Sequence, residues 1–207
     1  MKFYTAPHTC ALASRIALEE AGATYETVRV NFGANEQRGS AYLAVNPKGR
    51  VPSLVTARGV LTETPAMLLY IAQIFPAAKL APLDDAWALA QVQAFNSYLC
   101  STVHVAHAHR MRGYRWADDP AAIEAMKKKV PQSVGECFDL IEREMFEGPF
   151  VFGDAYTISD PYLFTIAQWW ELDGLEASRF PKLAAHRERM RERPAVKRAL
   201  AMEAGEG

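Results

Sequence analysis

Residues 51–65, VPSLVTARGVLTETP, decide how the N-terminal part of the chain folds. Two short apolar runs at 51–55 and 59–61 are separated by a turn, which predicts a pair of strands. Thr64 predicts the N-cap of a helix over 65–75, because a threonine hydroxyl accepts a backbone N–H there and a proline suits the first helical position. Two strands that lead directly into a helix indicate a mixed α/β unit.

The segments upstream of this stretch also alternate between strand and helix patterns. The helix candidate carries apolar residues among alanines and ends before Gly22, a residue type that commonly follows a helix. The strand candidates are short and rich in β-branched or aromatic residues. These elements are strands at 2–5 and 25–30, a helix at 10–21 and a helical turn at 40–43.

The composition changes at 76–82, PAAKLAP. Beyond it every long segment has helical periodicity, and the strand signal is limited to a brief run at 150–152. We therefore predict an α/β domain at 1–76, a linker at 77–83 and an all-α domain at 84–207. The helices of the second domain are expected at 84–112, 120–146, 161–172, 180–193 and 194–202.

Composition and charge exclude several classes of protein. The chain has 207 residues, 23 Lys+Arg against 24 Asp+Glu and 50% hydrophobic residues, which excludes collagen-like, disordered and disulfide-scaffold chains. The first 80 residues hold 8 basic and 5 acidic residues, a charge of +3 that a charge of -4 in the remainder offsets. The near-neutral balance predicts no nucleic-acid partner, and the lack of a run near the ~18 apolar residues of a membrane span predicts no membrane partner.

The three cysteines, Cys10, Cys100 and Cys137, are widely spaced. Their number and spacing fit neither a disulfide framework nor a zinc ribbon, so we expect reduced thiols and a cytoplasmic location. The polar first ten residues differ from a signal peptide.

Cys10 lies between the first predicted strand and the first predicted helix. Unpaired N–H groups and the helix dipole favour a thiolate at such a position, so the sequence predicts a Cys10 pKa below the usual value near ~8.5. A thiolate there attacks a disulfide or holds a thiol ligand, whereas a buried, inert cysteine is the structural alternative. Ala13 stands where a Cys-x-x-Cys pair would need its second thiol, which argues against a dithiol oxidoreductase.

Two further positions have both a structural interpretation and a ligand-binding interpretation. Pro52 opens a strand, and a cis bond before it would turn the backbone of Val51 toward an extended peptide, although a trans proline is commoner. A plain N-cap role is enough to explain Thr64. In the functional interpretation, the same helix N-terminus accepts a ligand carboxylate and Glu63 pairs with a ligand ammonium.

The helical domain carries a group of histidines. His104 and His107 are one turn apart and share a helix face, while His109 points elsewhere. No carboxylate lies within two turns of the first two on that face, so we predict no metal site. A polar lining for a cleft and a solvated histidine-rich face remain as the two interpretations.

Two motifs near the C-terminal end have structural explanations. Residues 157–160, TISD, have the form of a capping box in which aspartate replaces the usual glutamate. The Trp169-Trp170 pair fits a helical core.

In this order, these features resemble the cytosolic glutathione S-transferases and, within them, the bacterial beta class. The resemblance covers essentially the whole chain. It rests on CALAS at 10–14, YLAVNPKGRVP at 42–52, Glu63-Thr64, Gly153-Asp154 and TISD at 157–160.

The resemblance implies a thioredoxin-like N-terminal domain, an all-α C-terminal domain and a homodimer that binds glutathione as co-substrate in each subunit. Val51 would pair with the cysteinyl backbone of glutathione beside a cis Pro52. Glu63 and Thr64 would hold its γ-glutamyl end.

The family also places residues around the glutathione sulfur. Cys10 would lie at the sulfur, and His104 matches the histidine that the beta class places near it. Ser97 falls where that class has an asparagine that reaches across the dimer interface.

These observations predict a glutathione transferase, in which the glutathione thiolate attacks a small hydrophobic electrophile or a disulfide. Its acceptor pocket would be lined by His107, Met111, Tyr114 and Trp116, although core packing explains several of these residues equally well. Two alternatives stay open: a non-catalytic glutathione-binding or interaction module, and a dedicated glutathione-dependent isomerase or dehalogenase.

Overall fold

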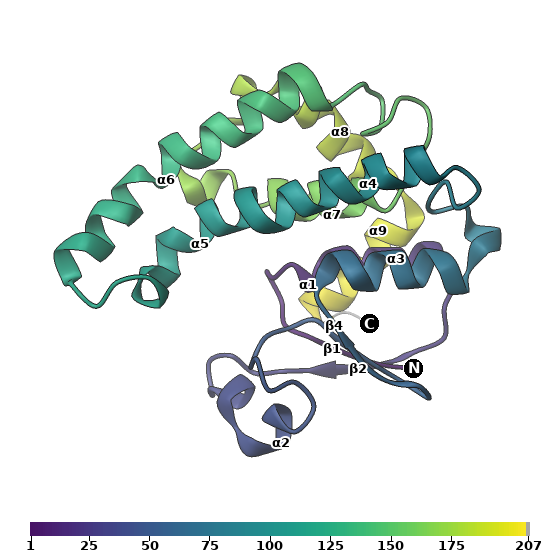
Figure 1. Ribbon diagram of the computed structural model, residues 1–207, viewed down its shortest axis with the longest axis horizontal. Coiled ribbons are helices and arrows are strands. Elements are labelled where there is room, and N and C mark those ends of the chain that lie inside the picture. The colour runs from purple at the N-terminus through teal and green to yellow at the C-terminus, as the bar shows by residue number, and fades with distance from the viewer. Residues whose placement is uncertain (206–207) are drawn as a thin grey trace.

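The computed structural model describes residues 1–205 and consists of a four-stranded sheet below a bundle of helices (Figure 1). The strand order is β2-β1-β3-β4, with β1 parallel to β2 and antiparallel to β3, and β3 antiparallel to β4. Strand β3 begins two residues later than predicted, since Pro52 has no N–H to donate to a neighbouring strand. The strands are β1 (Lys2–Thr5), β2 (Glu26–Arg29), β3 (Ser53–Thr56) and β4 (Gly59–Thr62).

Three helices belong to the N-terminal part: α1 (Ala11–Glu20), α2 (Ser40–Leu43) and α3 (Thr64–Ile74). As predicted, α1 is followed by Gly22, whose φ of +62° lies in the left-handed region that favours glycine. The predicted N-cap of α3 is wrong by one residue. Glu63 is the N-cap and Thr64 is the first helical residue, so the Thr64 hydroxyl is not a capping group.

The C-terminal part is helical, as the periodicity predicted, but its described residues form six α-helices where five helical segments were expected. The predicted helix at 84–112 is interrupted by a π-helical turn at Leu99–Val103, and the one at 161–172 ends early, with a 3₁₀ turn at Glu171–Asp173. The expected strand signal at 150–152 forms isolated bridges. The helices are α4 (Ala86–Tyr98), α5 (His104–Arg112), α6 (Pro120–Leu140), α7 (Ser159–Ala167), α8 (Pro181–Glu192) and α9 (Pro194–Ala204).

Helix α1 packs on both parts of the molecule. A cluster made of Leu12, Ile16, Phe164, Met190 and Val196 joins α1 to α7, α8 and α9. The chain returns through α9 to lie beside α1, which brings the C-terminal end back to the sheet (Figure 1). The N-terminus of α1 is therefore held in place by both parts. Among residues 1–205, no helix is long and apolar enough to cross a membrane.

The predicted capping box is present at the start of α7. The fully buried Asp160 carboxylate accepts hydrogen bonds from the Thr157 N–H at 2.7 Å and the Val151 N–H at 2.9 Å, and it contacts His186 Nε2 at 3.1 Å. Thr157 Oγ1 accepts the Ser159 N–H at 3.2 Å. One carboxylate thus joins the loop before α7, α7 itself and α8.

Candidate active site

A cavity of about 550 Å³ lies between the sheet-containing part and α5. Its walls are the turn before α1, the loop before β3, the first turn of α3, and α5 with the turn that follows it. All but one of the residues that the sequence singled out for chemistry line it: Cys10, Val51, Pro52, Glu63, Thr64, His104, His107, Met111, Tyr114 and Trp116.

The exception is Ser97, which is exposed on α4 and does not line the cavity of its own chain. The contact that the family resemblance implies for Ser97 would have to be made with glutathione in a partner subunit, and it stays a prediction.

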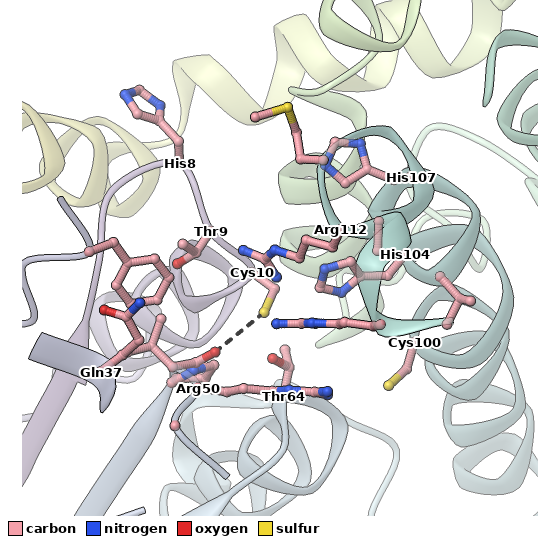
Figure 2. Close-up of a pocket in the computed structure, with 18 of the residues that line it drawn as sticks. His8, Thr9, Cys10, Gln37, Arg50, Thr64, Cys100, His104, His107 and Arg112 are labelled. Atoms are coloured by element: carbon pink, nitrogen blue, oxygen red, sulfur yellow. Dashed lines mark hydrogen bonds between the residues drawn. The ribbon is translucent and has the colours of Figure 1, made fainter. Parts of the chain in front are cut away.

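Cys10 occupies the N-cap position of α1, as expected from its place after β1. The turn before it is fixed by Thr9, whose Oγ1 donates to the Ala6 carbonyl at 2.7 Å and accepts the Ala11 N–H at 3.3 Å. Cys10 Sγ lies 3.7 Å from the Val51 carbonyl oxygen, the contact drawn as a dashed line in Figure 2. Thr64, His104 and Arg112 point toward the same space (Figure 2).

The predicted lowering of the Cys10 pKa is wrong for the protein without glutathione. Burial raises the pKa of the Cys10 thiol, and this effect outweighs the Thr64 hydroxyl and the Arg112 charge, which both lower it. Cys10 is therefore a thiol at neutral pH, a hydrogen-bond donor that becomes a nucleophile only when it is deprotonated.

His104 lies near Cys10 and packs on Trp169, with 5.0 Å between ring centroids. Burial, followed by the positive charges of His107 and Arg112, lowers the pKa of His104 to about 3. His104 is therefore a neutral hydrogen-bonding ring across the physiological range and cannot stabilise a thiolate as a cation.

This pKa predicts acid-sensitive stability. The unfolded chain binds a proton at His104 below pH ~6.5 and the folded chain only near pH 3, so the free energy of unfolding falls as the pH drops between these values. Between pH 7.5 and 4.5, urea unfolding should show wild type losing about 2 kcal/mol more than His104→Gln. An equal loss in wild type and His104→Gln would contradict the assignment.

The peptide bond before Pro52 is cis, as the family resemblance implies. Among the described residues, none accepts a hydrogen bond from the Val51 N–H. An extended ligand can therefore pair with the backbone of Val51, provided that it displaces the Cys10 thiol from the Val51 carbonyl.

The first turn of α3 lies on another wall of the cavity. Glu63 adopts φ of +72°, an unfavourable conformation for a residue with a side chain, and its carboxylate pairs with Lys48. The Thr64 N–H has no acceptor within residues 1–205, so it remains available to an anion at this helix N-terminus.

His107 belongs to a partly buried network around the Asp173–Arg110 ion pair. Its Nδ1 lies 2.7 Å from the Asp173 carboxylate, which also lies 3.2 Å from Arg110 Nε, and its ring stacks on Trp169 at 4.2 Å. His109 points away and packs on Trp116, as the helical spacing predicted. In the described part of the chain, no group of three His, Cys, Asp or Glu side chains is placed to hold a metal ion.

Several residues of the cavity were not predicted from the sequence. Arg50, Arg112 and Arg115 line it, and Trp169, assigned only to the core, forms part of its wall. The run MRGYR at 111–115, next to the predicted acceptor residues, was the available signal for two of these arginines.

The chain matches known proteins over nearly its full length. Models of the glutathione S-transferase N-terminal and C-terminal domains match residues 1–73 and 120–189. Glutathione S-transferase GstA of Escherichia coli O157:H7 is 31% identical over 206 residues, 98% of each chain. A solved glutathione transferase homologue from Sulfitobacter, with bound glutathione, is 42% identical with a TM-score of 0.94 and covers 100% of this chain and 98% of its own.

A bacterial beta-class glutathione S-transferase from Sphingomonas chungbukensis is 33% identical, with a TM-score of 0.86 and 98% of each chain covered. These similarities extend over both the sheet-containing part and the helical part, and they agree with the geometry of the cavity. The chain belongs to the glutathione S-transferase family.

Proposed function

We propose that this glutathione transferase binds glutathione across the cavity, with the sulfur at Cys10, and uses it for both conjugation and thiol transfer. The observation that carries the proposal is the convergence of Cys10, the backbone of Val51 and the N-terminus of α3 on one cavity. The N-terminal unit that provides these groups is proposed to end at 76, and the helical domain to begin at 84 after a linker.

The chemical groups of glutathione, taken from its γ-glutamyl end to its cysteine, match groups that line the cavity. Its γ-glutamyl carboxylate suits the Thr64 N–H at the positive end of α3, and its ammonium suits Glu63. Its cysteinyl backbone then pairs with Val51, which places the sulfur beside Cys10 and the neutral ring of His104.

Two reactions follow from that sulfur position. In conjugation, the glutathione thiolate forms a bond to an electrophilic carbon, and the leaving group departs with its electron pair. In thiol transfer, the Cys10 thiolate attacks a glutathione disulfide, forms a mixed disulfide and releases the other thiol. A second glutathione restores Cys10 and leaves as oxidised glutathione.

Glu63→Gln tests the site with 1-chloro-2,4-dinitrobenzene as electrophile. Removing the carboxylate charge that pairs with the glutathione ammonium should raise the KM for glutathione about tenfold and leave kcat within about twofold. Glu26→Gln on the edge strand β2, outside the cavity, is the matched control, because Glu26 is also an exposed carboxylate that pairs with a lysine, and it should behave as wild type. An unchanged KM in Glu63→Gln, or an equal rise in both variants, would place glutathione elsewhere.

The same assay separates the alternatives. A transferase consumes one glutathione for each chloride released. A binding module is saturated by glutathione without any turnover of electrophiles or disulfides. A dedicated isomerase returns its glutathione, so a preferred substrate that is converted without net loss of thiol would favour that function.

We also propose that the chain forms a homodimer in the cytoplasm. Ser97 is exposed on α4, where a partner subunit can reach it, and the three cysteines of the described chain are free. Sedimentation equilibrium should give twice the 23.0 kDa chain mass, and a monomer mass would exclude the role of Ser97.

A further inference from the structure

The acceptor side of the cavity is lined by positive charge as well as by the aromatic and apolar residues that the sequence predicted. The carboxylate of Glu63 lines the same cavity but is already paired with Lys48, and Asp173 pairs with Arg110. Within residues 1–205, no carboxylate lies within 4 Å of the remaining cavity arginines. The five arginines of the lining are Arg38, Arg50, Arg110, Arg112 and Arg115.

Two of these arginines, Arg112 and Arg50, repel Arg115. Partial burial, followed by the nearby charges of Arg112 and Arg50, lowers the pKa of Arg115. Arg112 and Arg115 are both half-buried, so water screens their repulsion incompletely. A bound anion relieves this repulsion, and a guanidinium fits a carboxylate with two parallel hydrogen bonds.

Glutathione does not supply enough negative charge to balance the cavity. Its γ-glutamyl carboxylate is assigned to α3, and its glycyl carboxylate pairs with at most part of the arginine group. Arg112 ends α5, and Arg115 lies in the 3₁₀ turn Gly113–Arg115 beside the exposed Tyr114 and Trp116. Arg112 points toward the space beside Cys10 (Figure 2), and its charge acts on both Cys10 and Arg115. These two arginines therefore lie where a second substrate would approach the glutathione sulfur.

We propose that the preferred acceptor is an anionic electrophile, an aromatic or similarly flat molecule whose carboxylate binds Arg112 and Arg115. Its apolar body lies on Met111, Tyr114 and Trp116, and its electrophilic carbon faces the glutathione sulfur. This inference rests on the proposed function and narrows its substrate class from hydrophobic electrophiles in general to those that carry an anionic group.

A pair of substrates that differ only in charge tests the inference. The probes are 4-chloro-3,5-dinitrobenzoate and its methyl ester, in which glutathione replaces the same chloride. Each enzymatic kcat/KM is divided by the rate of the uncatalysed reaction, because the ester group activates the ring more strongly. Wild type should favour the carboxylate over the ester by at least about tenfold, the factor expected for one charge-assisted hydrogen-bond pair.

The variant Arg115→Gln should lower this preference about tenfold, and added salt should lower it in wild type. Arg143→Gln is the matched control, because Arg143 is exposed and lies outside the cavity. A wild-type preference near one, or an unchanged preference in Arg115→Gln, would overturn the inference while ester turnover left the transferase function intact. No turnover of either probe would instead count against the proposed function.

Discussion

Replacing Asp160 with alanine should lower the free energy of unfolding by about 4 kcal/mol, the largest stability effect that we expect from one substitution. The carboxylate is fully buried and serves the Thr157 and Val151 N–H groups together with the His186 ring. Its removal leaves these donors buried without an acceptor, and each orphaned group costs about 1–3 kcal/mol. Urea unfolding followed by tryptophan fluorescence measures the change.

Asp160→Asn keeps one acceptor oxygen and provides a milder test, with an expected loss of about 2 kcal/mol. Asp154→Ala, six positions earlier on the exposed part of the same loop, should change stability by less than about 0.5 kcal/mol. A loss below about 1 kcal/mol in Asp160→Ala would show that the buried carboxylate does not hold the start of α7.

The second large effect is the loss of thiol transfer in Cys10→Ala, by at least about a hundredfold in kcat/KM. The mixed disulfide needs a sulfur at this position, and alanine provides none. Conjugation should survive in part, because there the attacking sulfur belongs to glutathione. Both reactions can be measured on one preparation. Thiol transfer is followed as the reduction of a glutathione mixed disulfide, and conjugation is followed with 1-chloro-2,4-dinitrobenzene.

Cys100 provides the control, because it also lines the cavity but comes from the π-helical turn Leu99–Val103 and not from the N-terminus of α1. Cys100→Ala should keep thiol transfer within about threefold of wild type. Because burial raises the Cys10 pKa, thiol transfer should accelerate about tenfold per pH unit between pH 7 and 8.5. Thiol transfer that persists in Cys10→Ala would show that Cys10 only lines the site.

Most of the side of the cavity where we propose that glutathione binds could be predicted from the sequence. Cys10, Val51 and Thr64 each lie at the end of a local element, and the turn, proline and capping patterns that place them span only a few residues. The sheet order then brings them to one cavity. The N-cap of α3 was predicted one residue too late, at Thr64. A threonine-proline pattern does not reveal that the backbone turns at Glu63 with a positive φ.

The acceptor side depends on contacts that local patterns do not contain. Asp173 lies 66 residues from His107 in the sequence, so the helical spacing around His107 could not predict this carboxylate partner. The π-helical turn at Leu99–Val103 adds a residue and rotates α5 by about 100° relative to an uninterrupted helix, a feature that the helical periodicity of 84–112 did not reveal. The pKa of Cys10 was predicted with the wrong sign because desolvation depends on packing rather than on helix position.

We infer that the glutathione sulfur meets Cys10, and the position of a covalent glutathione adduct reports on this contact. Wild-type protein incubated with oxidised glutathione at pH 8.5 and digested without reductant should carry one glutathione, located by peptide mass spectrometry on Cys10. Cys10→Ala should carry none. An adduct on Cys100 or Cys137 in its place, or an equal adduct on Cys10→Ala, would show that the glutathione sulfur does not meet Cys10.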